Sequence, residues 1–446
     1  MTEATPDGLQ DNLHELTGII NWLKGRAVPV VNLEAGHSLE DLMPLKDILK
    51  DARLVGLGEA THGTREFFQF KHRLVEFLAK EMDFTVFALE ASYAACVKIN
   101  DYVLYGQGDP AKALAGQGFW TWDTEEILDM IKWMREYNLT QPDSRKIRFY
   151  GYDVQNVNIA IDLVLDYVSK VAPEYSEKAS LALSAVSELQ RDPHSKQGNT
   201  DPARKAEAVQ RLYELVGILG MHRSRFIRKT STAEFTQVLQ NARVCLQYME
   251  SYGKPVSGTD GFMLRDLYMA ENIEYIAKCV EPEAKIAVWA HNGHIFTGQY
   301  LESIKSMGGL LREMFSDEYY ALGFSFFSGK VQSRDFSDPD VPGDLEEFSV
   351  PASRPGTVDW CLAETGIDNF IVDFRRPEIP PEARLWLETP RPMKSIGAGY
   401  IPDSRSEDFD QLVSPNCYDG LVFISRSSRA RPTPTGMRKS GRWARE

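Results

Sequence analysis

The sequence predicts an α/β fold with a mainly parallel central sheet, helices on both faces of the sheet and a helical insertion. Three observations lead to this prediction. Short, almost continuously apolar runs alternate with stretches of helical periodicity, as expected for strands buried on both faces. Two neighbouring runs flank one helical pattern, which is the β-α-β order of parallel strands joined by a right-handed crossover. Residues 155–281 contain helical patterns without a convincing strand.

The first β-α-β unit is expected near the start of the chain. Apolar residues at helical spacing occupy 8–24 and 39–51, and the run 53–58 is typical of a short buried strand that breaks at glycine. The helix expected over 66–82 has one apolar face, formed by Phe67, Phe70, Leu74, Phe77, Leu78 and Met82. A second apolar run, 84–90, follows at once and completes the unit.

Five more apolar runs of the same character occur farther along the chain, at 146–152, 285–290, 319–327, 369–374 and 420–425. Most of them are separated by helical patterns, so they extend the same parallel sheet. We therefore expect residues 1–154 to form the N-terminal part of one α/β core, and residues 282–426 to form its C-terminal part.

The span 155–281 between these parts is expected to be a mainly helical insertion or lid. Its helical patterns include 203–219, 232–252 and 263–280, and the polar stretch 191–204 is expected to be a mobile connection. Residues 427–446 place six basic side chains among Pro, Ser, Thr and Gly, a composition typical of a solvated, disordered tail.

Composition limits the possible partners. Hydrophobic residues make up 43% of the chain and charged residues 26%, as in ordinary globular proteins. The net charge of −14 argues against nucleic acid, because its binding requires a basic surface. No apolar run is long enough for a membrane span, and the first residues do not resemble a signal peptide, so we expect a cytoplasmic protein. The five cysteines are widely spaced, which favours reduced thiols.

Titratable side chains follow four of the expected strands. Glu59 and His62 follow the first strand, Glu90 the second and Asp153 the third, while His291 and His294 follow the run 285–290. Each could be a helix cap or an ordinary surface group if taken alone. Because ligands bind outside the carboxyl ends of parallel strands, their coincidence at one edge predicts an active centre.

His62 is the candidate general base of this centre. It lies in a strand-to-helix turn, GEATHG at 58–63, where glycines permit a tight backbone path and free N–H groups at the helix start can hold an anion. A neutral imidazole accepts a proton from water near pH 7, and a carboxylate such as Glu59 or Glu90 would fix its tautomer. The pattern therefore predicts a pair that activates water.

Several common catalytic motifs are excluded by pattern. The stretch after Gly58 resembles the start of a phosphate-binding loop, but Thr64 and Arg65 stand where Lys and Ser/Thr are required. The sequence contains no GxSxG elbow, no HExxH motif and no dinucleotide-binding GxGxxG after a strand.

Three interpretations of the remaining residues stay open. A divalent metal could be held by a subset of the strand-end donors, namely His62, His291, His294 and Glu59. Trp120, with its aromatic neighbours Phe119 and Trp122, could line an apolar substrate or simply pack in the core. Arg265 could orient an anion near the site or form a surface salt bridge.

Five blocks of this sequence resemble the erythromycin esterase family. They are GEATHGT at 58–64, FALE at 87–90, GYDVQ at 151–155, RDLYMAEN at 265–272 and WAHNGH at 289–294. Their order and spacing match over about residues 40–425. The resemblance implies an α/β sheet with a helical insertion and hydrolysis of a macrolactone ester by activated water, without a covalent intermediate or a cofactor.

The resemblance also implies roles for individual residues. His62 corresponds to the general base, Glu59 and Glu90 to the carboxylates that orient it or the water, and His291 to a second essential histidine. Lys71 stands where the antibiotic-resistance esterases carry Arg, and it or backbone N–H groups would hold the oxyanion. The expected partner is a small ester or lactone, such as a macrolide. A metal-dependent hydrolase and a non-catalytic polyketide- or glycan-binding protein are the alternatives.

Overall fold

A ten-stranded mixed sheet forms the centre of the protein in a computed structural model that describes residues 6–191, 202–251, 259–301, 304–337, 343–375, 377–402 and 404–438. The main strand order is β1-β10-β14-β8-β2-β5-β3-β4, and β9 and β12 also pair with β8. All pairings from β14 to β4 are parallel, whereas β1, β10 and β9 join antiparallel. The predicted fold class is confirmed.

The strands of this sheet, in chain order, are β1 (Val28–Pro29), β2 (Leu54–Leu57), β3 (Phe84–Ser92), β4 (Arg148–Asp153), β5 (Lys285–Trp289), β8 (Tyr319–Asp335), β9 (Leu345–Val350), β10 (Asn369–Asp373), β12 (Gly399–Tyr400) and β14 (Gly420–Ser427). Two small antiparallel pairs lie outside it, β6 (Gln299–Leu301) with β7 (Ile304–Lys305), and β11 (Arg391–Lys394) with β13 (Asp410–Val413). The central strand β2 is buried at every position, which explains its continuously apolar sequence.

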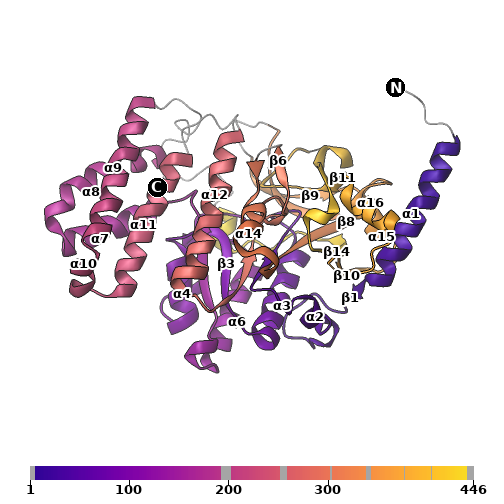
Figure 1. Cartoon of the computed structure of the whole chain (residues 1–446), viewed down its shortest axis with the longest axis horizontal. Coiled ribbons are helices and arrows are strands. Elements are labelled where there is room, and N and C mark those ends of the chain that lie inside the picture. The colour runs from indigo at the N-terminus through magenta and orange to yellow at the C-terminus, as the bar shows by residue number, and fades with distance from the viewer. Residues whose placement is uncertain are drawn as a thin grey trace.

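Helices cover both faces of the sheet (Figure 1). One apolar core cluster includes residues of α2 (Leu45–Ile48), α3 (Arg65–Met82), α4 (Cys96–Tyr105), α5 (Pro110–Gly116) and α6 (Glu125–Leu139). The other cluster includes residues of α1 (Pro6–Arg26), α12 (Thr259–Tyr275), α14 (Met307–Phe315), α15 (Val358–Ala363) and α16 (Pro381–Glu388). The two clusters divide the strand residues between them in the alternating manner of a pleated sheet.

Only helices occur among the described residues between β4 and β5. They are α7 (Asn158–Val171), α8 (Ser176–Arg191), α9 (Pro202–Met221), α10 (Arg223–Lys229), α11 (Thr232–Ser251) and α12, followed by a π-helical turn at Ile276–Val280. Helices α7 to α11 enclose a third core cluster of their own beside the sheet (Figure 1). Most of the polar connection expected at 191–204 lies outside the described residues.

The expectation of a disordered tail from residue 427 is wrong for residues 427–438. Ser427 still belongs to β14, Ala430 and Thr433 are buried, and residues Pro434–Arg438 form the short helix α17. Backbone hydrogen bonds tie this segment to the starts of α3 and α6. Basic composition suggested solvation, whereas the small residues between the arginines allow close packing. Residues 439–446 lie outside the described part of the chain.

The connections after β2 and β5 leave the sheet on opposite faces. β2 leads into α3, which packs in the first core cluster, while the neighbouring strand β5 leads through α13 (Asn292–Ile295) to α14 in the second cluster. Such a switch point opens a crevice at the carboxyl ends of the two strands. The fold thus places the end of β2 and the end of β5 side by side at a position suited to ligand binding.

Candidate active site

The turn after β2 is held by backbone hydrogen bonds from several distant segments. The Glu59 carbonyl accepts from the Asn292 N–H at 2.8 Å, and the Ala60 carbonyl accepts from the Ile396 N–H. Two glycines permit this enclosure: a Cβ on Gly58 would lie 2.2 Å from Asn292 Oδ1, and a Cβ on Gly63 would lie 1.8 Å from the Gln332 carbonyl oxygen. The turn is therefore a rigid part of the molecule rather than a free loop.

Glu59 is a fully buried carboxylate with three polar partners. Its Oε1 lies 2.7 Å from His62 Nδ1, and its Oε2 accepts from Lys71 Nζ at 2.6 Å and from Trp289 Nε1 at 2.9 Å. An ionised carboxylate facing Nδ1 fixes the proton of a neutral imidazole on that nitrogen. His62 Nε2 is then the nitrogen that can accept a proton.

His62 is held in place by its neighbours yet keeps contact with solvent. Its side chain is 13% exposed, its ring meets Trp122 edge-on with centroids 5.5 Å apart, and the ring of His291 lies 4.9 Å away. Trp122 is in turn anchored, because its indole N–H donates to the Glu90 carbonyl oxygen at 2.8 Å. The arrangement suits a base that must be both oriented and accessible.

Lys71 lies beneath this pair. It is fully buried on α3, and its ammonium stands 4.1 Å from the centroid of the Trp289 ring. Burial lowers the pKa of Lys71 to about 8, although Glu59 acts in the opposite direction. Because Nζ faces Glu59 inside the protein, the geometry does not suit the expected alternative in which Lys71 holds an oxyanion.

Glu90 forms the second carboxylate of the site and lies within β3. Its Oε2 accepts the backbone N–H of His291 at 2.9 Å, and its Oε1 accepts from Arg265 Nη2 at 2.6 Å. Burial alone would raise the pKa of Glu90, but His294, Arg265 and His62 together hold it well below its usual value. Glu90 is thus an ionised group that orders the ends of β3 and β5.

Arg265 joins the helical span to the sheet. From α12 its guanidinium makes a bidentate pair with Asp153, the last residue of β4, at 3.1 Å from Nε and 2.8 Å from Nη2. Asp153 also accepts from the Val154 N–H and caps the turn that follows β4. The alternative prediction of a surface salt bridge for Arg265 is therefore wrong, because its pairs with Glu90 and Asp153 are largely buried.

His294 lies between two acidic side chains. Nδ1 is 2.7 Å from Asp266 Oδ1, and Nε2 is 3.3 Å from Glu90 Oε1. Burial would lower the pKa of His294, but Asp266 and Glu90 outweigh it and raise the pKa to about 10. A contact of 2.9 Å between Arg265 Nη1 and Nε2 would instead suit a neutral ring. We favour the charged ring, because Arg265 alone cannot balance the carboxylates gathered around it.

His291 has the opposite electrostatic environment. Its Nδ1 accepts the N–H of Gly293 at 3.1 Å as the N-cap of α13, and burial, reinforced electrostatically by the neighbouring His62 and His294, lowers its pKa to about 3. The ring is therefore neutral, with its proton on Nε2. The buried Nε2 makes no hydrogen bond of regular geometry within the described part of the chain, although a weaker contact with the Ala60 backbone acts to raise the pKa.

The donors considered for a metal ion do not form a ligand group. Both His294 nitrogens already face charged side chains, and Lys71 occupies one oxygen of Glu59. Among the described residues, no three His, Cys, Asp or Glu side chains are arranged to hold a metal ion. The residues present therefore do not fit the metal alternative.

The structure brings together eight of the residues singled out from the sequence, and adds others. His62, Glu59, Lys71, Glu90, Asp153, Arg265 and His294 form one contact network around His291. Trp120 is half-buried, and it is Trp122 that contacts His62. Trp289, Asp266 and Asn292 were missed, although each stands inside a block used for the family resemblance.

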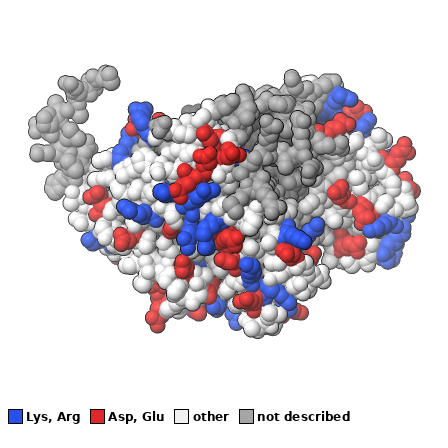
Figure 2. All heavy atoms as spheres, turned by 180° about the vertical axis from the view of Figure 1, so that it is seen from behind, with Lys and Arg blue, Asp and Glu red and all other residues white. Residues whose placement is uncertain are grey.

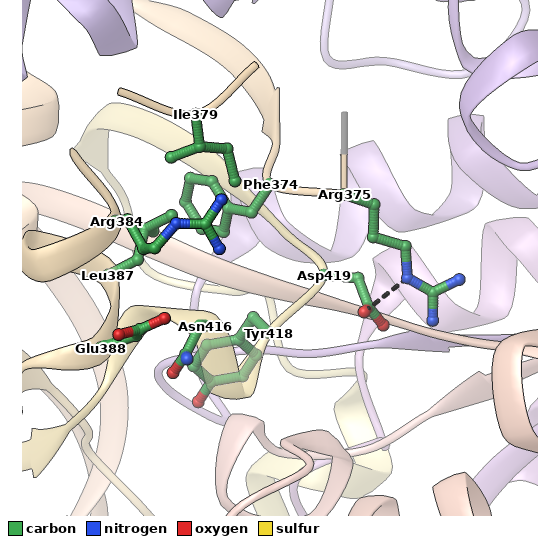
Figure 3. Close-up of a pocket in the computed structure, with 9 residues that line it drawn as sticks. All are labelled: Phe374, Arg375, Ile379, Arg384, Leu387, Glu388, Asn416, Tyr418 and Asp419. Carbon is green, nitrogen blue, oxygen red and sulfur yellow. Dashed lines mark hydrogen bonds and ion pairs between the residues drawn. The ribbon is translucent and has the colours of Figure 1, made fainter. Parts of the chain in front are cut away.

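Two pockets lie away from this network. The pocket in Figure 3, about 180 Å³, is lined by Phe374, Tyr418 and the Arg375–Asp419 ion pair beside the start of β14, at the opposite edge of the sheet. A second, of about 650 Å³, lies between α7 and α11. On the face seen in Figure 2, the acidic and basic side chains of the described residues are interspersed. Among the described helices, none has the length and apolar character that a membrane span requires.

Comparisons with solved structures support the fold. A Bacillus cereus protein of known structure superposes with a TM-score of 0.82 at 26% identity, covering 94% of this chain and 99% of that one. A mutant of the erythromycin esterase EreC in its open conformation has a TM-score of 0.69 at 16% identity, covering 91% and 98% of the two chains, which is a likeness of fold alone.

Sequence comparisons agree with this result. Erythromycin esterase type II of Escherichia coli is 26% identical over 389 residues, 79% of this chain and 88% of its own. The protein YbfO of Bacillus subtilis (strain 168), which carries a provisional hydrolase name, is 25% identical over 436 residues, 91% and 90% of the two chains. The family model for erythromycin esterase matches residues 79–427. These matches support a hydrolase, and the chain belongs to the erythromycin esterase family.

Proposed function

We propose that this protein hydrolyses a carboxylic ester by direct attack of water that His62 activates. One observation carries the proposal: Glu59 engages His62 Nδ1, so that Nε2 of a partly exposed imidazole is left to accept a proton. Neither Glu59 nor His62 lies within the residues matched by the family model, so their roles rest on the site geometry.

The proposed reaction has two steps. Water forms a bond from its oxygen to the carbonyl carbon while its proton passes to His62 Nε2, which leaves a negative charge on the former carbonyl oxygen. The tetrahedral centre then breaks its bond to the alcohol oxygen, and that oxygen takes the proton from His62. The products are a carboxylic acid and an alcohol, and no bond to the protein forms.

Hydrogen-bond donors near His62 stabilise the oxyanion in this proposal. The buried Nε2–H of His291, which lies beside the Ala60 backbone, belongs to a neutral ring 4.9 Å from the His62 ring. A donor that is already ordered stabilises developing charge at low cost in reorganisation. In this proposal His291, rather than Lys71, donates the hydrogen bond that stabilises the oxyanion.

The substrate class proposed is a lactone, and a macrolide lactone in particular. Two erythromycin esterases of Escherichia coli are among the relatives, and each is matched over most of its own length. Hydrolysis of a lactone opens the ring and adds one water to the molecule, so the product is directly visible by mass.

The test compares the wild type with His62→Ala on a panel of macrolides and other lactones. We expect a mass gain of one water, with one ¹⁸O atom from labelled water in the new carboxyl group. His62→Ala should reduce turnover by at least about 10²-fold, the usual contribution of a general base. The control is His37→Ala, which removes a half-exposed histidine distant in the sequence. Unchanged turnover by His62→Ala, or intact ligand after incubation with stoichiometric wild type, would contradict the proposal.

A further inference from the structure

A segment near the end of the described chain crosses the turn that carries His62 and the turn that carries Trp122. We call this segment, residues 428–436, the strap. It follows β14, lies beyond the residues matched by the family model, and is not part of the catalytic network described above. Its contacts nevertheless converge on the turn that carries Glu59 and His62 and on the turn that carries Trp122.

The strap pairs first with the start of α3. The Arg65 N–H donates to the Ser428 carbonyl oxygen at 3.0 Å, and the Ala430 N–H donates to the Gly63 carbonyl oxygen at 3.0 Å. Arg65 is the first residue of α3, so its N–H has no partner within the helix. The strap therefore caps α3 directly beside His62.

The strap then repeats this pairing at the start of α6. The Glu125 N–H donates to the Arg431 carbonyl oxygen at 2.8 Å, and the Thr433 N–H donates to the Asp123 carbonyl oxygen at 3.0 Å. Glu125 is likewise the first residue of its helix. Asp123 follows Trp122, the residue whose ring contacts His62.

Side chains reinforce the second pairing. Arg431 Nε lies 2.8 Å from Oε1 of the buried Glu126, and Thr433 Oγ1 donates to Asp123 Oδ1 at 2.5 Å. The fit is close, because a Cβ on the buried Gly436 would lie 2.4 Å from the Asp123 carbonyl oxygen. The strap thus joins the two helix starts through both backbone and side-chain contacts.

We propose that the strap is a positioning element that fixes His62 against Trp122 by capping α3 and α6 together. This inference rests on the proposed function for its consequence in turnover. Neither Arg431 nor Gly436 is placed near reacting atoms, so each acts through the turns it holds. A shift of about 1 Å in a catalytic group can cost about 10²-fold in rate, so loosening either turn should lower kcat.

The experiment uses two strap variants of the full chain. Gly436→Ala forces the strap away from Asp123, and its matched control is Gly217→Ala in α9, where an added methyl group meets nothing within 4 Å. Arg431→Ala breaks the pair with Glu126, and its control is Arg211→Ala, which breaks an exposed pair with Glu207. Arg431→Lys, which keeps a charge near Glu126, is the conservative variant.

The first readout is backbone hydrogen exchange without substrate. We expect faster exchange at the amides of Arg65 and Glu125 in both strap variants, and wild-type exchange in both controls. The second readout is ester hydrolysis, in which kcat should fall about 10-fold to 100-fold with KM nearly unchanged, and Arg431→Lys should recover most of the loss.

Exchange at Arg65 and Glu125 that stays as in the wild type would overturn the inference. Exchange that accelerates uniformly over the whole chain would overturn it as well, since that result reports general destabilisation. If Gly436→Ala fails to fold, the partly exposed Arg431 provides the decisive variant. If the wild type hydrolyses no ester, the proposed function fails by itself, and the strap is judged on amide exchange alone.

Discussion

At the scale of single residues, the pairing of Glu59 with Lys71 determines how His62 is oriented. Both side chains are fully buried, and each would be an uncompensated charge without the other. Desolvation of two such charges costs several kcal/mol, so a buried pair is weak as a source of stability. Under the proposed function, the pair serves to supply a fixed carboxylate to His62 Nδ1.

This account predicts different effects of Lys71 on stability and on activity. Lys71→Met leaves Glu59 without its cation and should lower the free energy of unfolding by about 3–5 kcal/mol. Adding Glu59→Gln removes the stranded charge, so the double variant should recover most of that loss in urea denaturation. Hydrolysis should stay well below that of the wild type in the double variant, since a neutral amide can accept the Nδ1–H of His62 but cannot balance the charge that the ring acquires with a proton. Recovery of both properties together would contradict the assigned role.

At the scale of elements, Asn292 extends the sheet where β2 ends. Its Nδ2 donates to the Phe324 carbonyl oxygen at 2.7 Å, and its Oδ1 accepts the Phe324 N–H at 3.0 Å. Phe324 lies in β8 just beyond the last residue that pairs with β2. The side-chain amide of Asn292 thus replaces the backbone partner that Phe324 would have if β2 continued. The backbone can therefore turn away from the sheet at Glu59.

Replacing this amide should therefore destabilise the centre of the sheet. Asn292→Ala leaves a buried N–H and a buried carbonyl of Phe324 unpaired, each costing about 1–3 kcal/mol. We expect the midpoint of urea unfolding to fall accordingly, whereas Asn416→Ala, at an exposed position, should leave it unchanged. Equal midpoints for the two variants would show that the β8 groups find other partners.

At the scale of the whole molecule, the candidate active site joins the helical span to the sheet. Arg265 and Asp266 reach the strand ends from α12, and Asn272, on the same helix, donates to the Tyr152 carbonyl oxygen at 3.0 Å. Charges contributed by both parts of the chain meet around Glu90 and His294. The stability of the complete protein should therefore respond to their protonation.

The raised pKa of His294 gives this response a defined sign. Between the unfolded value near 6.5 and the folded value of about 10, the native protein binds more protons than the unfolded chain. The stabilisation from His294 is therefore complete below pH 6.5 and is lost as the pH rises toward 10. We expect the difference in unfolding free energy between wild type and His294→Gln to shrink over that interval. A difference that stayed constant between pH 6.5 and pH 10 would indicate a ring that is neutral in the native protein.

Local patterns in the sequence determined the architecture and the location of the site. Continuous apolar runs specify strands buried on both faces, and they predicted that Glu59, His62, Glu90, Asp153 and His291 would share one edge. The carboxyl end of each parallel strand is set by chain direction alone. Such information is local, and it needs no knowledge of which strands are neighbours.

Tertiary structure alone decided which of these side chains touch and what each can do. The strand order puts β5 between β2 and β3. His291, which follows β5, therefore lies beside His62 and donates its backbone N–H to Glu90. Burial then makes His291 neutral and paired carboxylates keep His294 charged, although both are histidines in one short motif. The contacts of the strap likewise depend on the tertiary structure alone. Its hydrogen bonds join residues far apart in the sequence, and pairing of this kind leaves no periodic signal along the chain.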